Sequence, residues 1–235
     1  MSSAAPQLPS PEAFDRLTEH IQTFRAAIPQ HVRIVAVTKT LPAWMIRAAY
    51  AVGIRDVGEN RIQEAIAKRA ELQDLPDITW HYIGHLQSNK AQKALDSFDW
   101  IQSVDSLALA QRLNRLAIAR SAKPNICLQV KLLDDPAKSG WTVPDLQRDL
   151  AALGSFKNLN IRGLMVIAPY GLSTADLTKL FCRAQKLHHQ LADSLLLGSG
   201  FTELSMGMSG DYGVAIAQGS TMIRPGQVLF GERQG

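Results

Sequence analysis

The first regular pattern of apolar residues in the chain has the spacing of a helix. Apolar side chains recur at steps of three and four between residues 11 and 28, and the set comprises Phe14, Leu17, Ile21, Phe24 and Ile28. Residues at this spacing lie on one face of an α-helix. Pro29 follows directly, and because proline removes a backbone N–H and restricts the residue before it, we expect the helix to end there.

Beyond this helix, short apolar runs alternate with segments of helical periodicity. The runs that predict strands cover residues 33–39, 54–60, 78–84, 100–105, 125–132, 159–168, 202–206 and 221–226. The segments that predict helices cover residues 43–53, 61–72, 89–95, 106–120, 143–153, 173–196 and 211–219. Strands joined by helical crossovers run parallel, and strands covered by helices on the outside are apolar along most of their length.

This alternation predicts an α/β fold, a single-domain (β/α)8 barrel of the TIM type with an extra amino-terminal helix. Eight strands that alternate with helices in 235 residues favour a closed barrel over an open doubly wound sheet, because such barrels have about 250 residues. We expect residues 11–235 to form the barrel. Residues 1–10 are rich in serine and proline, which is typical of a disordered arm.

Composition and charge narrow the class of protein. Apolar residues make up 46% of the chain and charged residues 20%, as in an average soluble protein, and no apolar run approaches the ~20 residues that span a bilayer. The amino terminus has no signal-peptide pattern, so we expect a cytoplasmic protein. The net charge is +4, the basic residues are scattered among acidic ones, and aromatic residues make up only 6% of the chain. These features do not favour nucleic-acid binding. Cys127 and Cys182 are isolated in the sequence, which argues against a disulfide framework and against a thiolate metal site.

One lysine closes the first predicted strand. Lys39 ends the apolar run from residue 33, and in a parallel barrel the carboxyl ends of the strands form the face on which ligands bind. A lysine at this rim commonly keeps its ammonium in water or pairs with an acid. Alternatively, a partly apolar wall and nearby cations lower its pKa and leave the amine able to condense with an aldehyde.

The segment from residue 204 to 226 has the residues of an anion site. Small residues surround a predicted short helix, and Ser209, Ser220 and Thr221 supply hydroxyl groups. A turn of this composition is often only a turn, but barrels bind phosphate in the loops after strands seven and eight. Arg224 ends the eighth strand, beside the first strand of a closed barrel. An amine, a phosphate site and a fixed cation around one opening suit an aldehyde-bearing phosphate cofactor such as pyridoxal 5′-phosphate (PLP).

A resemblance to a known family accompanies these features. The motifs AVTKT, DVGENRIQEA, WHYIGHLQSNK, KSG, GLMVIA and LSMGMSGDYGVAIAQGSTMIRPG, followed by LFGER, stand in order from about residue 12 to 233. In these motifs the chain resembles the pyridoxal-phosphate homeostasis proteins (the YggS/PROSC-like family). The resemblance implies a barrel similar to the amino-terminal domain of bacterial alanine racemase.

The resemblance also implies a set of cofactor-binding residues. It implies that Lys39 forms the Schiff base and that Arg224 faces the pyridine nitrogen. Ser209 and the backbone around Gly226 and Gln227 would hold the phosphate, with help from Ser220 and Thr221. Asn60 and His85 would lie beside the ring.

The chemistry favours a carrier over an enzyme. Arginine remains protonated, so it donates to the pyridine nitrogen and weakens the ring as an electron sink. Racemisation needs a second acid/base group, and the sequence places none of the four tyrosines there. We expect a monomeric, non-catalytic PLP-binding protein of vitamin B6 and amino-acid homeostasis, a carrier, buffer or regulator that contacts apoenzymes. A weak PLP-dependent racemase, a class I aldolase and a regulatory partner-binding protein remain alternatives. His81 and His85 stand four residues apart, but on a predicted strand and its loop instead of one helical face, which does not favour a metal site.

Overall fold

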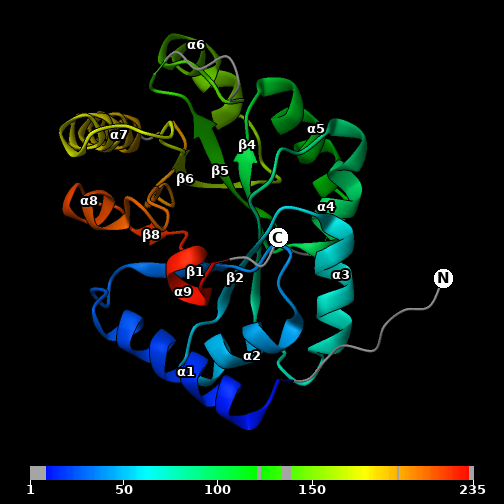
Figure 1. Cartoon of the computed structure of the whole chain (residues 1–235). Helices are drawn as coiled ribbons and strands as arrows, with labels where there is room; N and C mark the ends of the chain where they lie inside the picture. Colours follow the sequence, from blue (N-terminus) through cyan, green and yellow to red (C-terminus); the bar gives the residue numbers. More distant parts are fainter. Residues whose placement is uncertain (1–8, 121–122, 134–138, 195, 233–235) are drawn as a thin grey trace.

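The protein forms a closed barrel of eight parallel strands in sequence order (Figure 1). The computed structural model describes residues 9–120, 123–133, 139–194 and 196–232. The strands are β1 (Arg33–Val37), β2 (Asp56–Glu59), β3 (Thr79–Tyr82), β4 (Trp100–Val104), β5 (Asn125–Val130), β6 (Asn160–Val166), β7 (Glu203–Ser205) and β8 (Met222–Ile223). The barrel closes where Arg33 of β1 pairs with Met222 of β8. The predicted (β/α)8 fold class is confirmed.

Helices surround the strands, as Figure 1 shows for the chain coloured from blue to red. They are α1 (Pro11–Ala26), α2 (Ala43–Ala51), α3 (Ile62–Glu71), α4 (Ala91–Ser97), α5 (Leu107–Ala117), α6 (Val143–Gly154), α7 (Thr174–Asp193), α8 (Tyr212–Ala217) and α9 (Gln227–Phe230), with a 3₁₀ turn η1 (Ser88–Lys90) before α4. Side-chain oxygens of Ser10, Ser106, Thr142 and Ser173 accept hydrogen bonds from the first turns of their helices, which satisfies backbone N–H groups that lack helical partners.

The structure differs from the expected elements at the ends of the chain and at the ends of the strands. The predicted disordered arm, residues 1–10, falls mostly outside the described residues, but Ser10 caps α1. α9 forms in a segment for which the sequence predicted no helix. β1 ends at Val37, two residues before Lys39, because the chain turns there: Leu41 N–H donates to the Thr38 carbonyl, and Thr40 has φ 65°.

The apolar core has two zones, one between helices and strands and one inside the barrel. The predicted apolar face of α1 is confirmed, since Ile21 and Phe24 are buried against β1, α2 and α9. Inside the barrel, Val35, Trp100, Cys127, Met165 and Met222 pack together.

Both cysteines are free thiols. None of the described helices is long and apolar enough to cross a membrane.

Candidate functional site

A cavity of about 830 Å³ opens at the carboxyl ends of the strands. Its walls come from the ends of β1 and β6, from the loop between β7 and α8, and from the segment after β8. Five of the residues predicted from sequence line this cavity, namely Lys39, Ser209, Arg224, Gly226 and Gln227. The fold therefore brings an amine, a guanidinium and a hydroxyl group to one opening.

Lys39 stands on a turn that a buried ion pair supports. The side chain of Lys39 is half-buried, and the preceding Thr38 is buried. The Thr38 hydroxyl donates to Glu59 Oε1 at 2.6 Å, and Lys68 Nζ lies 2.5 Å from the same oxygen. Lys68 also donates to the Thr38 carbonyl at 2.8 Å. Lys39 directly follows Thr38, and Asn60 directly follows Glu59. The network therefore fixes the strand ends that carry Lys39 and Asn60.

Arg224 is a buried cation in the wall of the cavity. Its side chain is almost completely buried, and its guanidinium donates to Ser205 Oγ at 2.6 Å and to the Val166 carbonyl at 2.8 Å. Burial lowers the pKa of Arg224 to about 10. The group therefore stays protonated at neutral pH and can only donate hydrogen bonds.

Ser209 marks a place where backbone N–H groups converge. The N–H of Gly226 lies 3.0 Å from Ser209 Oγ, and the N–H of Val228 lies 3.2 Å from it. Gly226 and Ser209 both line the cavity. Converging N–H groups with a hydroxyl form the kind of donor set that holds a phosphate.

Asn60 and His85 lie on the same end of the barrel but do not line the cavity. Asn60 directly follows β2, and its Oδ1 is buried without a hydrogen-bond partner in the described part of the chain. His85 follows β3 with its side chain 61% exposed, and Nδ1 lies 3.0 Å from Asp105 and 3.3 Å from Ser139. An unpaired amide oxygen is costly unless a ligand or water meets it, so Asn60 fits a ligand contact better than His85 does.

The structure does not bring Ser220 and Thr221 to this mouth. Both precede β8 and so lie at the amino ends of the strands. The Ser220 hydroxyl is buried among the carbonyls of Leu204, Met206 and Met222. Thr221 Oγ1 donates to Glu203. Their hydroxyl groups bind the barrel wall, and Ser220 and Thr221 do not line the cavity that contains Lys39 and Ser209.

The cavity has walls that sequence reasoning missed. The loop after β6 contributes residues 167–172, and the carboxylates of Asp211 and Glu232 also line it. Tyr170 stands on this loop with its side chain fully exposed. No local pattern marks these residues as ligand-binding; only their position after a strand's carboxyl end would have selected them.

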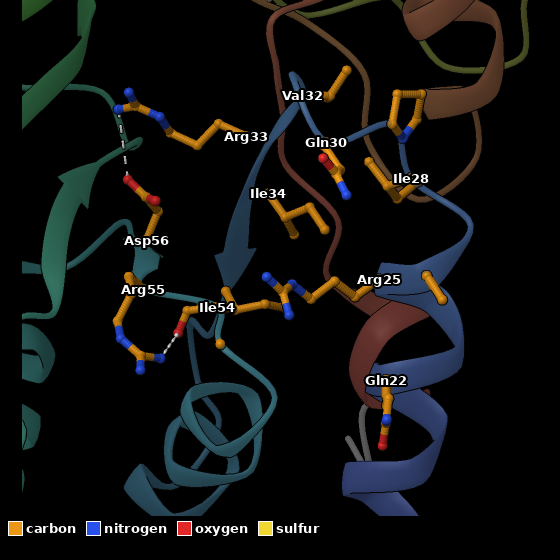
Figure 2. Close-up of a pocket in the computed structure, with 13 residues that line it drawn as sticks. Gln22, Arg25, Ile28, Gln30, Val32, Arg33, Ile34, Ile54, Arg55 and Asp56 are labelled. Carbon is orange, nitrogen blue, oxygen red and sulfur yellow. Dashed lines mark hydrogen bonds and ion pairs between the residues drawn. The ribbon is translucent and has the colours of Figure 1, made fainter.

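A second cavity, of about 710 Å³, lies at the opposite end of the barrel, between α1 and the starts of β1 and β2. Figure 2 shows Arg25 extending from α1 toward the turn at Ile54, while Arg33 and Asp56 face each other at 3.7 Å. Among the described residues, no lysine lines this cavity, so an aldehyde finds no amine partner for an imine in that part of the chain. The mouth that contains Lys39 is the candidate functional site.

The residues of the Lys39 mouth fit PLP. A half-buried amine can meet the aldehyde, a fixed donor can meet the ring nitrogen, and the N–H groups that converge on Ser209 can bind a phosphate. Asn60, whose Oδ1 has no hydrogen-bond partner among the described residues, lies at the same end of the barrel but outside the lining of this cavity. Among the described residues, no three His, Cys, Asp or Glu side chains are grouped as a metal ion would require.

Comparisons with known proteins agree with this chemistry. The family model described as "Alanine racemase, N-terminal domain" matches residues 13–234. The "Pyridoxal phosphate homeostasis protein" of Synechocystis sp. is 51% identical over 208 residues, which cover 88% of this chain and 94% of the relative.

Two solved structures show how far the fold is shared. The structure of PipY from Synechococcus elongatus PCC7942 with PLP bound has a TM-score of 0.87 at 51% identity and covers 92% of this chain and 100% of that one. An alanine racemase of Clostridium difficile 630 has a TM-score of 0.74 at 14% identity and covers 94% of this chain and 60% of that one. The second similarity shows the fold alone.

Proposed function

Because the chain belongs to the pyridoxal phosphate homeostasis protein family, we propose that it binds PLP covalently as a Schiff base on Lys39 and acts in intracellular vitamin B6 and amino-acid homeostasis. The observation that carries the proposal is that Lys39, Ser209 and Arg224 line the same cavity. When bound, PLP supplies an aldehyde that an amine can hold reversibly.

Each residue has a separate task in this proposal. Lys39 provides the covalent anchor, and Arg224 donates a hydrogen bond to the ring nitrogen. Ser209 and the N–H groups of Gly226 and Val228 hold the phosphate, and Gln227 adds a side-chain donor at the rim. Asn60 contacts the ring edge, while His85, which is exposed, takes an outer position.

The proposal assigns a carrier or buffer role in preference to catalysis. Arg224 keeps its proton, so the ring nitrogen stays unprotonated and carbanion chemistry is disfavoured. The mouth is open: Tyr170 and Met208 line it and are exposed, and enzymes of this chemistry exclude water from the reacting carbon. A weak racemase remains the second candidate, and Tyr170 is the tyrosine that lines this cavity among the described residues.

The same proposal includes a cytoplasmic, monomeric protein with one barrel domain over residues 11–235. Light scattering at several concentrations tests the oligomeric state, and a dimer that persists on dilution would contradict it. Apoenzymes that need PLP are the expected partners, because an open mouth can give its cofactor to another protein.

Transfer of the cofactor tests the carrier role. The PLP-loaded protein, freed of unbound cofactor, is mixed with an apoenzyme of known activity. A carrier restores that activity at a rate set by the loaded protein, and Lys39→Ala does not. A protein that restores no activity but exchanges the α-hydrogen of amino acids in heavy water would instead be a racemase.

A further inference from the structure

A continuous chain of hydrogen bonds runs through the barrel from Arg224 to the second cavity. Arg224 lies 2.6 Å from Ser205 Oγ, which lies 2.7 Å from Gln102 Oε1. Gln102 Nε2 lies 2.9 Å from His81 Nδ1, and His81 Nε2 lies 2.8 Å from Asp56 Oδ1. Asp56 lines the cavity that Figure 2 shows. The five side chains come from five strands or strand ends, so the chain crosses the barrel interior.

The two ends determine the direction of every bond. Arg224 has donors only, and an ionised Asp56 has acceptors only. The Ser205 hydroxyl therefore accepts from Arg224 and donates to Gln102. The Gln102 amide then donates to His81 Nδ1, which leaves the proton of a neutral imidazole on Nε2, facing Asp56. One arrangement of protons satisfies all five groups.

Burial makes this arrangement costly to disturb. His81, Gln102 and Ser205 are completely buried, and Arg224 is 4% exposed. Burial also lowers the pKa of His81, against the opposing effect of Asp56, which favours the neutral ring. A buried polar group that loses its partner incurs the full penalty of desolvation, so the five groups support one another.

These five hydrogen-bonded side chains are not needed to fill the barrel. The same interior holds Val35, Trp100, Met165 and Met222, and apolar residues in place of a buried charged network are often at least as stable. What the network adds is orientation. Ser205 and the Val166 carbonyl bind two nitrogens of one planar guanidinium, and these two bonds together fix its plane in the cavity wall.

We infer that Ser205, Gln102, His81 and Asp56 are positioning residues that hold Arg224 in the orientation needed at the cofactor's ring nitrogen. This inference rests on the proposed function. Ser205 touches Arg224 directly, and the other three act through it. Removal of any link leaves the guanidinium charged but loosely oriented, so the contact with the ring nitrogen weakens while Lys39 and the phosphate site stay intact.

The test uses Ser205→Ala and Gln102→Leu in the full chain, with Ser205→Thr to restore the hydroxyl. Val35→Ala is the control, because it alters the same buried interior without a hydrogen bond to the chain. The measurements are the dissociation constant for PLP and the ¹⁵N chemical shift of the ring nitrogen in labelled bound PLP.

We expect Ser205→Ala and Gln102→Leu to bind PLP about tenfold more weakly, the equivalent of losing one charge-assisted hydrogen bond, and to shift the ring ¹⁵N signal. Ser205→Thr should recover the wild-type shift, and Val35→Ala should keep it. Unchanged affinity and unchanged ¹⁵N shift in both chain variants would overturn the inference while leaving PLP binding in place. A wild-type protein that takes up no PLP would overturn the proposed function as well.

Discussion

Lys68 Nζ lies 2.5 Å from Glu59 Oε1, and both side chains are buried, at 8% and 0% exposure. The pair joins α3 to the end of β2, and Thr38 at the end of β1 binds both partners. Burial raises the pKa of Glu59, and the Lys68 ammonium opposes that rise. The pair therefore links α3 to the strand ends at Thr38 and Glu59, the residues that directly precede Lys39 and Asn60.

Loss of Lys68 should destabilise the fold strongly. In Lys68→Met, Glu59 is left as an uncompensated buried carboxylate, and we expect the free energy of unfolding to fall by about 3–5 kcal/mol in urea titrations. The double variant Glu59→Leu/Lys68→Met should recover most of that loss, since it removes both charges.

An exposed ion pair provides the control for this prediction. Arg148 and Asp145 lie 2.6 Å apart with side chains 67% and 43% exposed, so Arg148→Met should change the free energy of unfolding by less than about 1 kcal/mol. If Lys68→Met and Glu59→Leu/Lys68→Met lower the free energy of unfolding equally, the pair contributes through packing and not through charge.

Gly163 allows β6 and β7 to approach closely. A Cβ atom at this position would lie 1.7 Å from the Glu203 carbonyl oxygen, while one at Gly213 in α8 would meet no atom within 4 Å. Gly163→Ala should therefore lower the free energy of unfolding by about 3 kcal/mol or more. Gly213→Ala should raise it by up to about 1 kcal/mol, as expected within a helix. Calorimetry that ranks the two variants in the opposite order would contradict the close approach of β6 and β7 at Gly163.

His188 makes stability depend on pH. Burial, and to a lesser degree His189, lowers the pKa of His188 from 6.5 to about 4. Between these values the unfolded chain binds a proton that the folded protein does not, so stability falls as the pH is lowered from about 6.5 to about 4.

Replacement of the ring isolates this contribution. His188 stacks on Phe201 with centroids 5.1 Å apart, so His188→Phe keeps an aromatic contact and should flatten the stability profile over that pH range. His31→Gln, at an exposed position, should leave the slope unchanged. Identical slopes in the wild type and His188→Phe would mean that His188 is protonated in the folded protein.

Ser209 should contribute to affinity through the phosphate. Ser209→Ala removes the hydroxyl on which two backbone N–H groups converge, and we expect PLP to bind about tenfold more weakly. Pyridoxal, which lacks the phosphate, should bind Ser209→Ala and the wild type equally. Ser155→Ala serves as the control, because the Ser155 hydroxyl donates to the Ala152 carbonyl at the end of its own helix. An equal loss of affinity for PLP and for pyridoxal would show that Ser209 does not contact the phosphate.

The barrel could be predicted because apolar runs and helical spacing are local patterns. The same patterns missed α9, since four residues, Gln227–Phe230, with no side-chain cap have no distinguishing period. The family resemblance implies that Ser220 and Thr221 help to hold the phosphate, and both stand in the small-residue segment that suggests an anion site. They precede β8, whereas Ser209 follows β7, and residues before and after parallel strands lie at opposite ends of a barrel.

The interior chain from Arg224 to Asp56 could not be predicted at all. Ser205, Gln102, His81 and Asp56 stand at ordinary strand positions. Which strand residues meet depends on the offset between neighbouring strands. That offset, such as Asp56 beside Thr79 and Val35 beside Asp56, is set by packing of the whole barrel and leaves no trace in any one segment. Lys39 and Arg224 were easier to select because strand ends are visible in the sequence.

The most direct test of the account is to reduce the PLP-treated protein with borohydride and measure the mass of the whole chain and of its peptides. We predict one reduced pyridoxyl-phosphate group, attached to the peptide that contains Lys39, and none on Lys39→Ala treated in the same way. A wild-type chain that gains no mass, or one modified equally with Lys39 absent, would contradict the central claim.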